Sequence, residues 1–171
     1  MGENVIADAG QDAGRDAGTP VNAVAFRDPP PFTAEAGGQH FTFYPAGADR
    51  RHALMRLVAE ARERLDVCFY IFAEDAVGTE LRDALCAAAA RGVAVTLIVD
   101  RFGASVTDAF LKPLADAGGQ YLFFSPRWTQ RYLIRNHQKM VNADGTQAMF
   151  GGFNIADDYF ASPDEDGWND L

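Results

Sequence analysis

Residues 91–100, Arg-Gly-Val-Ala-Val-Thr-Leu-Ile-Val-Asp, decide the fold class of this chain of 171 residues. The apolar run from Val93 to Val99 is typical of a strand that is buried on both faces. Before it, apolar residues keep helical spacing as far as Gly92, where a glycine ends the helix. These residues are Leu81, Ala84, Leu85 and Ala88. A helix that leads directly into a buried strand predicts one repeat of an α/β fold.

The same alternation extends in both directions from this repeat. Upstream, residues 67–72 form a second buried apolar run, preceded by a strand at residues 40–44 and a helix capped by Asp49. Downstream, we expect a helix around residues 108–117 and a third strand at residues 121–124. Strands that alternate with helices pair in parallel, with the helices as covering layers. The sequence therefore predicts an α/β fold with a mixed, largely parallel sheet flanked by helices.

The first residues of the chain lack this pattern. Residues 7–18 repeat Asp-Ala-Gly three times and carry no large side chain beyond Arg15. They cannot bury enough surface to offset the entropy of ordering. Three prolines and two glycines then keep the chain irregular up to Gln39. We expect a disordered leader over residues 1–38 and one domain over residues 39–171.

Composition limits the classes of function. The net charge of -9 argues against binding nucleic acid through a broad basic face, so a nucleic-acid partner is not expected. The longest apolar run is far shorter than the roughly 20 residues that span a membrane. Residues 1–15 lack the apolar segment of a secretory signal. We expect a cytoplasmic protein, or one peripheral to the inner membrane, in which Cys68 and Cys86 are ordinary buried thiols.

A tighter pattern lies further along the chain. Residues 136–144 are Asn-His-Gln-Lys-Met-Val-Asn-Ala-Asp, and residues 151–154 are Gly-Gly-Phe-Asn. The pattern is His-x-Lys-x4-Asp-x6-Gly-Gly-x-Asn, which arises by chance in only about a few per million chains of this size. Residues 138–142 and 147–150 are expected to form two strands joined by an Asp-Gly turn. The motif therefore lies on a β-hairpin.

The residue types of the motif suit attack on a phosphodiester. His137 and Lys139 are two residues apart, so their side chains share one strand face and can converge on one ligand. Neutral imidazole is a good nucleophile, and an ammonium group can hold a phosphate oxygen. Asn154 can donate a further hydrogen bond. Gly151 and Gly152 let a phosphate approach the backbone closely.

This motif resembles the catalytic motif of the phospholipase D superfamily, whose enzymes cleave or exchange phosphodiesters through a phosphohistidine. The resemblance implies that His137 is the nucleophile and that Lys139 and Asn154 bind the phosphate, without a metal or other cofactor. The family uses two such motifs per active site, and this sequence contains one. Neither His40 nor His52 has a lysine two residues on, so neither supplies the second motif.

The roles of two carboxylates stay open at this point. Asp144 is either a catalytic residue that orients the site or only a favourable turn residue. Trp-Asn-Asp at residues 168–170 resembles a family segment whose carboxylate accepts a hydrogen bond from a catalytic imidazole. Asp170 either has this catalytic role or belongs to an acidic tail. Turn or cap duty is expected for three carboxylates that follow buried strands: Glu74, Asp75 and Asp100.

Three arginines precede the motif at a spacing of four: Arg127, Arg131 and Arg135. In a helix they share one face, which is either solvated or a patch for an anionic head group. The resemblance also covers Arg-Asn-His-Gln-Lys at residues 135–139. We expect Arg131, Arg135 and Asn136 to bind substrate, together with Gly151 and Gly152.

Further segments favour one branch of the superfamily. They are Phe-Tyr-Ile-Phe at residues 69–72, the strand at residues 91–100, Gly-Gly-Phe-Asn-Ile-Ala-Asp-Asp-Tyr-Phe at residues 151–160 and Trp-Asn-Asp-Leu at residues 168–171. Together they are similar to the N-terminal half of the bacterial cardiolipin synthases. This resemblance implies a phosphatidyltransferase that acts on phosphatidylglycerol in peripheral contact with a membrane. It also implies a second motif, supplied by a missing C-terminal half.

Two alternatives remain beside this interpretation. A homodimer with one motif per subunit would be a single-motif phosphodiesterase or nuclease, which the acidic charge disfavours. An inactive fragment or lipid-binding module would keep the fold without turnover. In the two catalytic cases the isolated monomer is expected to be inactive.

Overall fold

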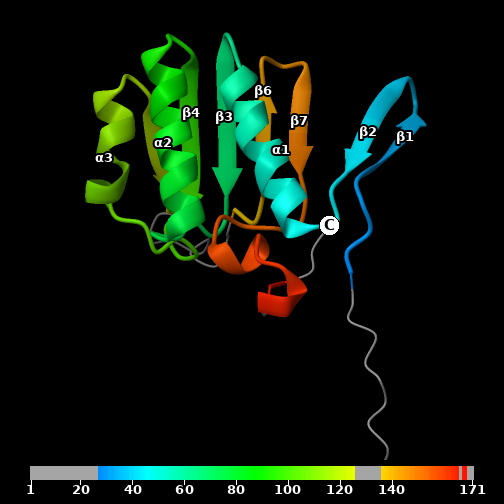
Figure 1. Ribbon diagram of the computed structural model, residues 1–171. Helices are drawn as coiled ribbons and strands as arrows, with labels where there is room; N and C mark the ends of the chain where they lie inside the picture. The colour runs from blue at the N-terminus through cyan, green and yellow to red at the C-terminus, as the bar shows by residue number, and fades with distance from the viewer. Residues whose placement is uncertain (1–26, 126–135, 166, 169–171) are drawn as a thin grey trace, which may run out of the picture.

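The computed structural model describes residues 27–125, 136–165 and 167–168. Its helices are α1 (Gly47–Glu60), α2 (Ala76–Ala90) and α3 (Asp108–Asp116), followed by the short 3-10 helices η1 (Asp157–Tyr159) and η2 (Pro163–Glu165). Its strands are β1 (Phe32–Ala36), β2 (Gln39–Phe43), β3 (Arg64–Phe69), β4 (Ala94–Asp100), β5 (Gln120–Phe124), β6 (Met140–Ala143) and β7 (Gln147–Phe150). Figure 1 shows their arrangement. None of these helices is both long and apolar enough to cross a bilayer.

Strands β3 to β7 form one mixed sheet in the order β5-β4-β3-β6-β7. β3 pairs in parallel with β4, and β4 with β5, as expected for the repeated β-α units. β6 is antiparallel to β3, and β7 is antiparallel to β6, as expected for the hairpin. The predicted α/β fold with a mixed sheet is confirmed. Met140, the first residue of β6, pairs with Cys68, so the residues just before β6 lie at the carboxyl end of β3.

The helices α1, α2 and α3 lie on the same face of this sheet (Figure 1). The order β3, β4, β5 steps in one direction, and right-handed crossovers then place α2 and α3 on the same side. Alternate strand residues are buried in the core cluster, among them Leu65, Val67, Phe69, Val95, Leu97, Val99 and Val141. Between them, Ile98 is half-buried and Leu122 is exposed. The expectation of a strand buried on both faces is therefore wrong for β4, whereas in β3 the consecutive residues Val67, Cys68 and Phe69 are all buried.

The segment before the sheet is more regular than the sequence predicts. Phe32–Ala36 forms β1, antiparallel to β2, so the expectation of an irregular chain up to Gln39 is wrong. The two glycines between these strands have positive φ angles of 57° and 76°, which only glycine adopts readily, and they form a hairpin turn. Phe32 and Phe43 stack across the pair, with ring centroids 4.8 Å apart.

The boundaries of α1 also differ from the expectation. The helix begins at Gly47 with Ala46 as N-cap and without a side-chain cap, so Asp49 is not the capping residue. Asp49 lies in the first turn, where its negative charge still favours the helix dipole. The sequence also predicts that the helical spacing of Leu54, Leu57, Val58 and Ala61 continues to Leu65, but Leu65 belongs to β3.

Candidate active site

The side chains of His137 and Lys139 are in contact at the carboxyl end of the parallel strands. Lys139 Nζ lies 3.1 Å from Nδ1 of His137 and 3.4 Å from Nε2, and it donates to the His137 carbonyl oxygen at 3.1 Å. Lys139 is 8% exposed, whereas His137 is exposed. The contact places a cation against the ring that can act as a nucleophile.

The ring of Tyr70 packs against this pair. Its centroid lies 4.7 Å from that of the His137 ring, with 49° between the ring planes, and 5.7 Å from Lys139 Nζ. Tyr70 directly follows β3 and therefore stands at the same end of the sheet as His137. Sequence reasoning missed Tyr70 as a site residue. Its position after a buried strand was the available signal, because ligand residues of α/β proteins collect there.

Asn136, a predicted substrate-binding residue, forms hydrogen bonds that hold the chain leading into His137. Its backbone N–H donates to Oδ2 of Asp100 at 2.9 Å. Its side-chain amide donates to Sγ of Cys68 at 3.1 Å and accepts from the backbone N–H of Gln138 at 3.2 Å. Burial raises the pKa of the Cys68 thiol, so this sulfur stays neutral. These contacts give Asn136 a positioning role.

Asp100 connects this segment to the end of β4. Its Oδ1 accepts from the backbone N–H of Phe102 at 2.9 Å, which is the turn duty expected from the sequence. Its Oδ2 accepts from Asn136, which the sequence did not predict. Asp100 is only 1% exposed, so its carboxylate depends on these backbone donors.

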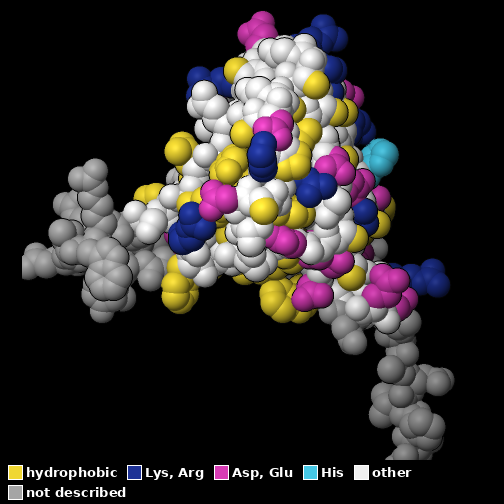
Figure 2. All heavy atoms as spheres, turned by 90° about the vertical axis from the view of Figure 1, so that its left-hand side faces the viewer, with side chains coloured by type: hydrophobic (Ala, Val, Ile, Leu, Met, Phe, Trp, Pro, Cys, Tyr) yellow, Lys and Arg dark blue, Asp and Glu magenta, His cyan; other side chains and the backbone are white. Residues whose placement is uncertain are grey.

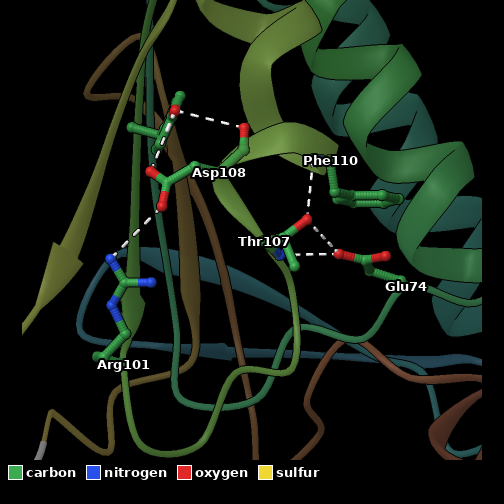
Figure 3. A network of polar contacts seen from close by, with 6 residues as sticks. Glu74, Arg101, Thr107, Asp108 and Phe110 are labelled. Atoms are coloured by element: carbon green, nitrogen blue, oxygen red, sulfur yellow. Dashed lines mark hydrogen bonds and ion pairs between the residues drawn. The ribbon is translucent and has the colours of Figure 1, made fainter.

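The cap role expected for Asp75 is confirmed, whereas Glu74 bonds to a residue 33 positions away. Glu74 accepts from the backbone N–H and the hydroxyl of Thr107, at 2.7 and 2.8 Å (Figure 3). Thr107 is in turn the N-cap of α3. Oδ1 of Asp75, the N-cap of α2, accepts from the backbone N–H of Gly78 at 2.8 Å.

Asn154 is held beside the end of β3 and is 2% exposed. Its Nδ2 donates to the hydroxyl of Tyr159 at 2.8 Å, and its Oδ1 accepts from the backbone N–H of Ile71 at 3.0 Å. These bonds use the amide oxygen and one N–H, and a primary amide carries a second N–H. Gly151 and Gly152 connect β7 to this segment, the first half-buried and the second exposed.

Reciprocal hydrogen bonds fix the chain that follows Asn154 to the loop after β3. The backbone N–H of Asp157 donates to Oδ2 of Asp75, and the N–H of Val77 donates to Oδ1 of Asp157, each at 2.8 Å. Ile155 forms a parallel bridge with Phe72. Segments about 80 residues apart in the sequence are thus held together, since the first of these bonds spans 82 positions and the second 80.

Asp144 lies at the opposite end of the hairpin from His137. β6 separates it from Lys139 by five residue steps, or about 16 Å at about 3.3 Å per residue. Its carboxylate accepts from three consecutive backbone N–H groups, at 2.9 Å from Arg64, 2.8 Å from Glu63 and 3.0 Å from Arg62. These bonds lower the pKa of Asp144 below its ordinary value. Of the two roles left open, the geometry favours the structural one over an orienting role at His137.

Several predicted site residues lie outside the described residues: Arg131, Arg135 and Asp170, together with Arg127. Trp168 is described, and its ring packs against that of Tyr159 with centroids 4.9 Å apart. Through Tyr159, whose hydroxyl bonds to Asn154, this places Trp168 close to the Gly-Gly-x-Asn segment.

The described residues bring together no group of three or more His, Cys, Asp or Glu side chains that could hold a metal ion. What they place beside the exposed imidazole is the ammonium group of Lys139. A cation in that position attracts an anionic ligand such as a phosphate.

Comparison with known proteins agrees with the sequence resemblance. Residues 54–168 match the family model described as "Cardiolipin synthase, PLD-like domain". The chain is 36% identical over 118 residues to cardiolipin synthase A of Pseudomonas syringae, covering 66% of this chain and 25% of that protein. It is 34% identical over 130 residues to the major cardiolipin synthase ClsA of Bacillus subtilis, covering 72% and 27%. The chain thus spans about a quarter of the length of these curated relatives.

A solved structure shares the fold. NucT from Helicobacter pylori superposes with a TM-score of 0.54 at 18% identity, covering 67% of this chain and 72% of that chain. At this identity the likeness concerns the fold alone. The resemblance drawn from the His-x-Lys motif is confirmed at the level of the family. Because the family model matches well over half of its residues, this protein belongs to the phospholipase D-like domain family of the cardiolipin synthases.

Proposed function

We propose that this chain supplies the nucleophile of a phosphatidyltransferase of the cardiolipin synthase type, which acts on phosphatidylglycerol through a phosphohistidine at His137. The contact between Lys139 Nζ and the His137 ring is the observation that carries the proposal. It joins a nucleophile to a phosphate-binding cation at the end of the sheet where α/β proteins bind ligands. Membership of the cardiolipin synthase family supports the choice of a phospholipid as substrate.

The proposed reaction has two displacement steps. A ring nitrogen of His137 attacks the phosphorus of phosphatidylglycerol. The bond from phosphorus to the oxygen of the head-group glycerol breaks. The leaving glycerol takes a proton from a second histidine, which acts as general acid. A hydroxyl group of another phosphatidylglycerol then gives its proton to this second histidine and attacks the phosphorus. The N–P bond breaks and cardiolipin is released.

Lys139 and Asn154 act on the charge of the phosphoryl group. The ammonium of Lys139 lies beside the imidazole and neutralises a non-bridging oxygen. The second amide N–H of Asn154 donates to another non-bridging oxygen. Gly151 and Gly152 leave room for the phosphate. Asp144 has no direct part in these steps, because its carboxylate is engaged by the backbone at the far end of β6.

The second histidine comes from outside the one motif in this sequence. We assign it to the part of a cardiolipin synthase that this chain does not match, and a second copy of this chain is the alternative source. Arg131 and Arg135 are proposed to bind the anionic head group, and Asp170 to orient an imidazole. The reaction takes place in peripheral contact with the inner membrane, where phosphatidylglycerol resides.

Charge makes a nuclease the weaker alternative. The chain has a net charge of -9, and on the face that carries α3 basic and acidic side chains are mixed (Figure 2). Two bases there are paired with acids, Lys112 with Asp116 and Arg101 with Asp108. Nucleic-acid binding without sequence specificity needs unpaired basic surface.

The experiment tests whether two separate polypeptides together restore phosphatidyl transfer. The chain is mixed with the remainder of the Pseudomonas syringae cardiolipin synthase A on vesicles of phosphatidylglycerol, and cardiolipin and glycerol are measured. The mixture should form both products, and mass spectrometry after an alkaline quench should find the phosphatidyl group on His137. The chain alone, shown to be monomeric by its mass in solution, should form neither. Turnover by the monomer would overturn the shared site.

Other results distinguish the alternatives. Hydrolysis of a chromogenic phosphodiester by a homodimer, without lipid transfer, would identify a phosphodiesterase. Vesicle binding without turnover in any mixture would identify a lipid-binding module. His52→Ala, which removes an exposed histidine of α1, is the matched control for His137→Ala. Loss of activity in EDTA would refute the metal-free mechanism.

A further inference from the structure

Tyr70 is in contact with both groups of the proposed chemistry but has no step in it. One side of the residue meets the His137 ring at 4.7 Å between centroids. Tyr70 also packs closely against Gly103, in the loop after β4. A Cβ added to Gly103 would lie 2.9 Å from ring atoms Cε2 and Cζ of Tyr70 and 2.5 Å from its carbonyl oxygen. Tyr70 therefore occupies the space that a side chain at position 103 would need.

We propose that Tyr70 is a positioning residue of this site: its ring, supported by the backbone at Gly103, holds the imidazole of His137 in the orientation for attack. The inference rests on the proposed function for the reaction that the orientation serves. The contact itself is a property of the fold. Neither the sequence motif nor the family match assigns Tyr70 a role.

The physical basis is the freedom of an exposed side chain. His137 is exposed, and without a neighbouring ring its imidazole would populate several rotamers. A tilted aromatic contact removes those that turn the imidazole away from Tyr70. Nucleophilic attack needs the reacting atoms at short distance and in line, so the occupancy of one rotamer enters the rate directly.

The same ring also faces the ammonium of Lys139. Nζ lies 5.7 Å from the Tyr70 centroid, within the range of a cation–π attraction. One ring thus contacts both the nucleophile and the cation. The ring supplies both contacts, so Phe at position 70 should preserve them, and Ala or Leu should not.

The first test follows the imidazole itself and needs no turnover. The chain has three histidines, so its proton spectrum contains three sets of imidazole signals, and His137→Ala assigns one of them. In Tyr70→Ala and Tyr70→Leu the His137 signals should lose the ring-current shift, while Tyr70→Phe keeps it. The signals of His40 and His52 should not move. Unchanged His137 signals in both aliphatic variants would overturn the proposal.

The second test measures the rate in the two-polypeptide mixture with phosphatidylglycerol vesicles. Tyr70→Ala should lower kcat by about tenfold with little change in KM, because orientation acts after binding. Tyr70→Phe should stay within about twofold of the unmodified chain. An equal loss in Tyr70→Phe would assign the effect to the hydroxyl group and overturn the positioning role, as would a change in KM alone.

Tyr121→Ala is the matched control, since it removes another half-buried tyrosine, from β5. It should leave both the His137 signals and kcat unchanged. If the unmodified mixture forms no cardiolipin and no adduct on His137, the proposed function fails. The imidazole signals then still decide whether Tyr70 holds His137.

Discussion

The two ends of the β6–β7 hairpin belong to one sequence motif but differ in the contacts that their side chains make. At the end before β6, the exposed imidazole of His137 contacts an ammonium group and an aromatic ring. The preceding residue, Asn136, holds the backbone there through a hydrogen bond to Asp100. At the turn, the carboxylate of Asp144 accepts hydrogen bonds from three backbone N–H groups, those of the two residues before β3 and of its first residue. One end presents side chains to a ligand, and the other attaches the hairpin to the sheet. Residues that recur together in a motif can therefore serve chemistry and folding separately.

His137→Ala should have the largest effect on activity and almost none on folding. Loss of the nucleophile should reduce turnover at least about 10⁴-fold, because no other group of the motif can form the covalent bond. The side chain is exposed, so the free energy of unfolding should change by less than about 0.5 kcal/mol. Cardiolipin formation and a urea titration test the two statements. A large loss of stability would show that His137, like Asp144, has a structural role.

Lys139→Met should have the second largest effect on activity. Methionine keeps an unbranched chain in this mostly buried position but removes the cation, and turnover should fall by about 10²- to 10³-fold. Lys112→Met, at an exposed lysine of α3, is the matched control and should be neutral. The measurement is kcat and KM for phosphatidylglycerol. Equal rates in the two variants would remove Lys139 from the chemistry.

Asp100→Ala should affect both activity and stability, because this carboxylate joins the end of β4 to the chain before His137. The backbone N–H groups of Phe102 and Asn136, which are partly buried, lose their acceptor, at a cost of about 1 kcal/mol each. Turnover should fall by about tenfold as His137 shifts. Glu74→Ala, which removes a carboxylate that holds the start of α3, should lower stability and leave turnover unchanged. If both variants lose turnover alike, the effect of Asp100 is general destabilisation.

Asp144→Asn should have the smallest effect on activity, within about twofold per folded molecule, and should act on stability. The pKa of Asp144 is lowered from 3.8 in the folded chain. Its contribution is therefore complete above that value and is lost as the pH falls through the lowered pKa. The urea midpoint of the variant should be reduced at pH 7, and the difference from the unmodified chain should shrink as the pH falls below 3.8. A difference that does not depend on pH would contradict the role given to the carboxylate.

Local patterns predicted the elements well. The apolar runs at residues 67–72 and 93–99 identified β3 and β4 to within a few residues, because a buried strand must be apolar. The Asp-Gly turn predicted the hairpin. His137 and Lys139 do meet, but both precede β6, so the strand alternation used to predict their meeting was wrong. Boundaries were less accurate. β1 was missed, because the prolines and glycines around it also suit irregular chain.

Contacts between distant segments could not be predicted in the same way. Asn136 has the residue type of a substrate donor, yet its partners are Asp100 and Cys68, from β4 and β3. Asn154 bonds to Tyr159 and to the backbone of Ile71. Each assignment depends on which strand ends become neighbours, and spacing along one segment does not contain that information.

The sequence by itself determined the fold class, the family and the pair of side chains suited to a phosphodiester, because periodicity and motif spacing are local properties of the chain. The tertiary structure alone decided that α1, α2 and α3 lie on one face, that Asp144 attaches the hairpin to the start of β3, and that Tyr70 packs on His137. These depend on the strand order β5-β4-β3-β6-β7, which brings the ends of β3, β4 and β6 together. Strand order follows from packing the whole core.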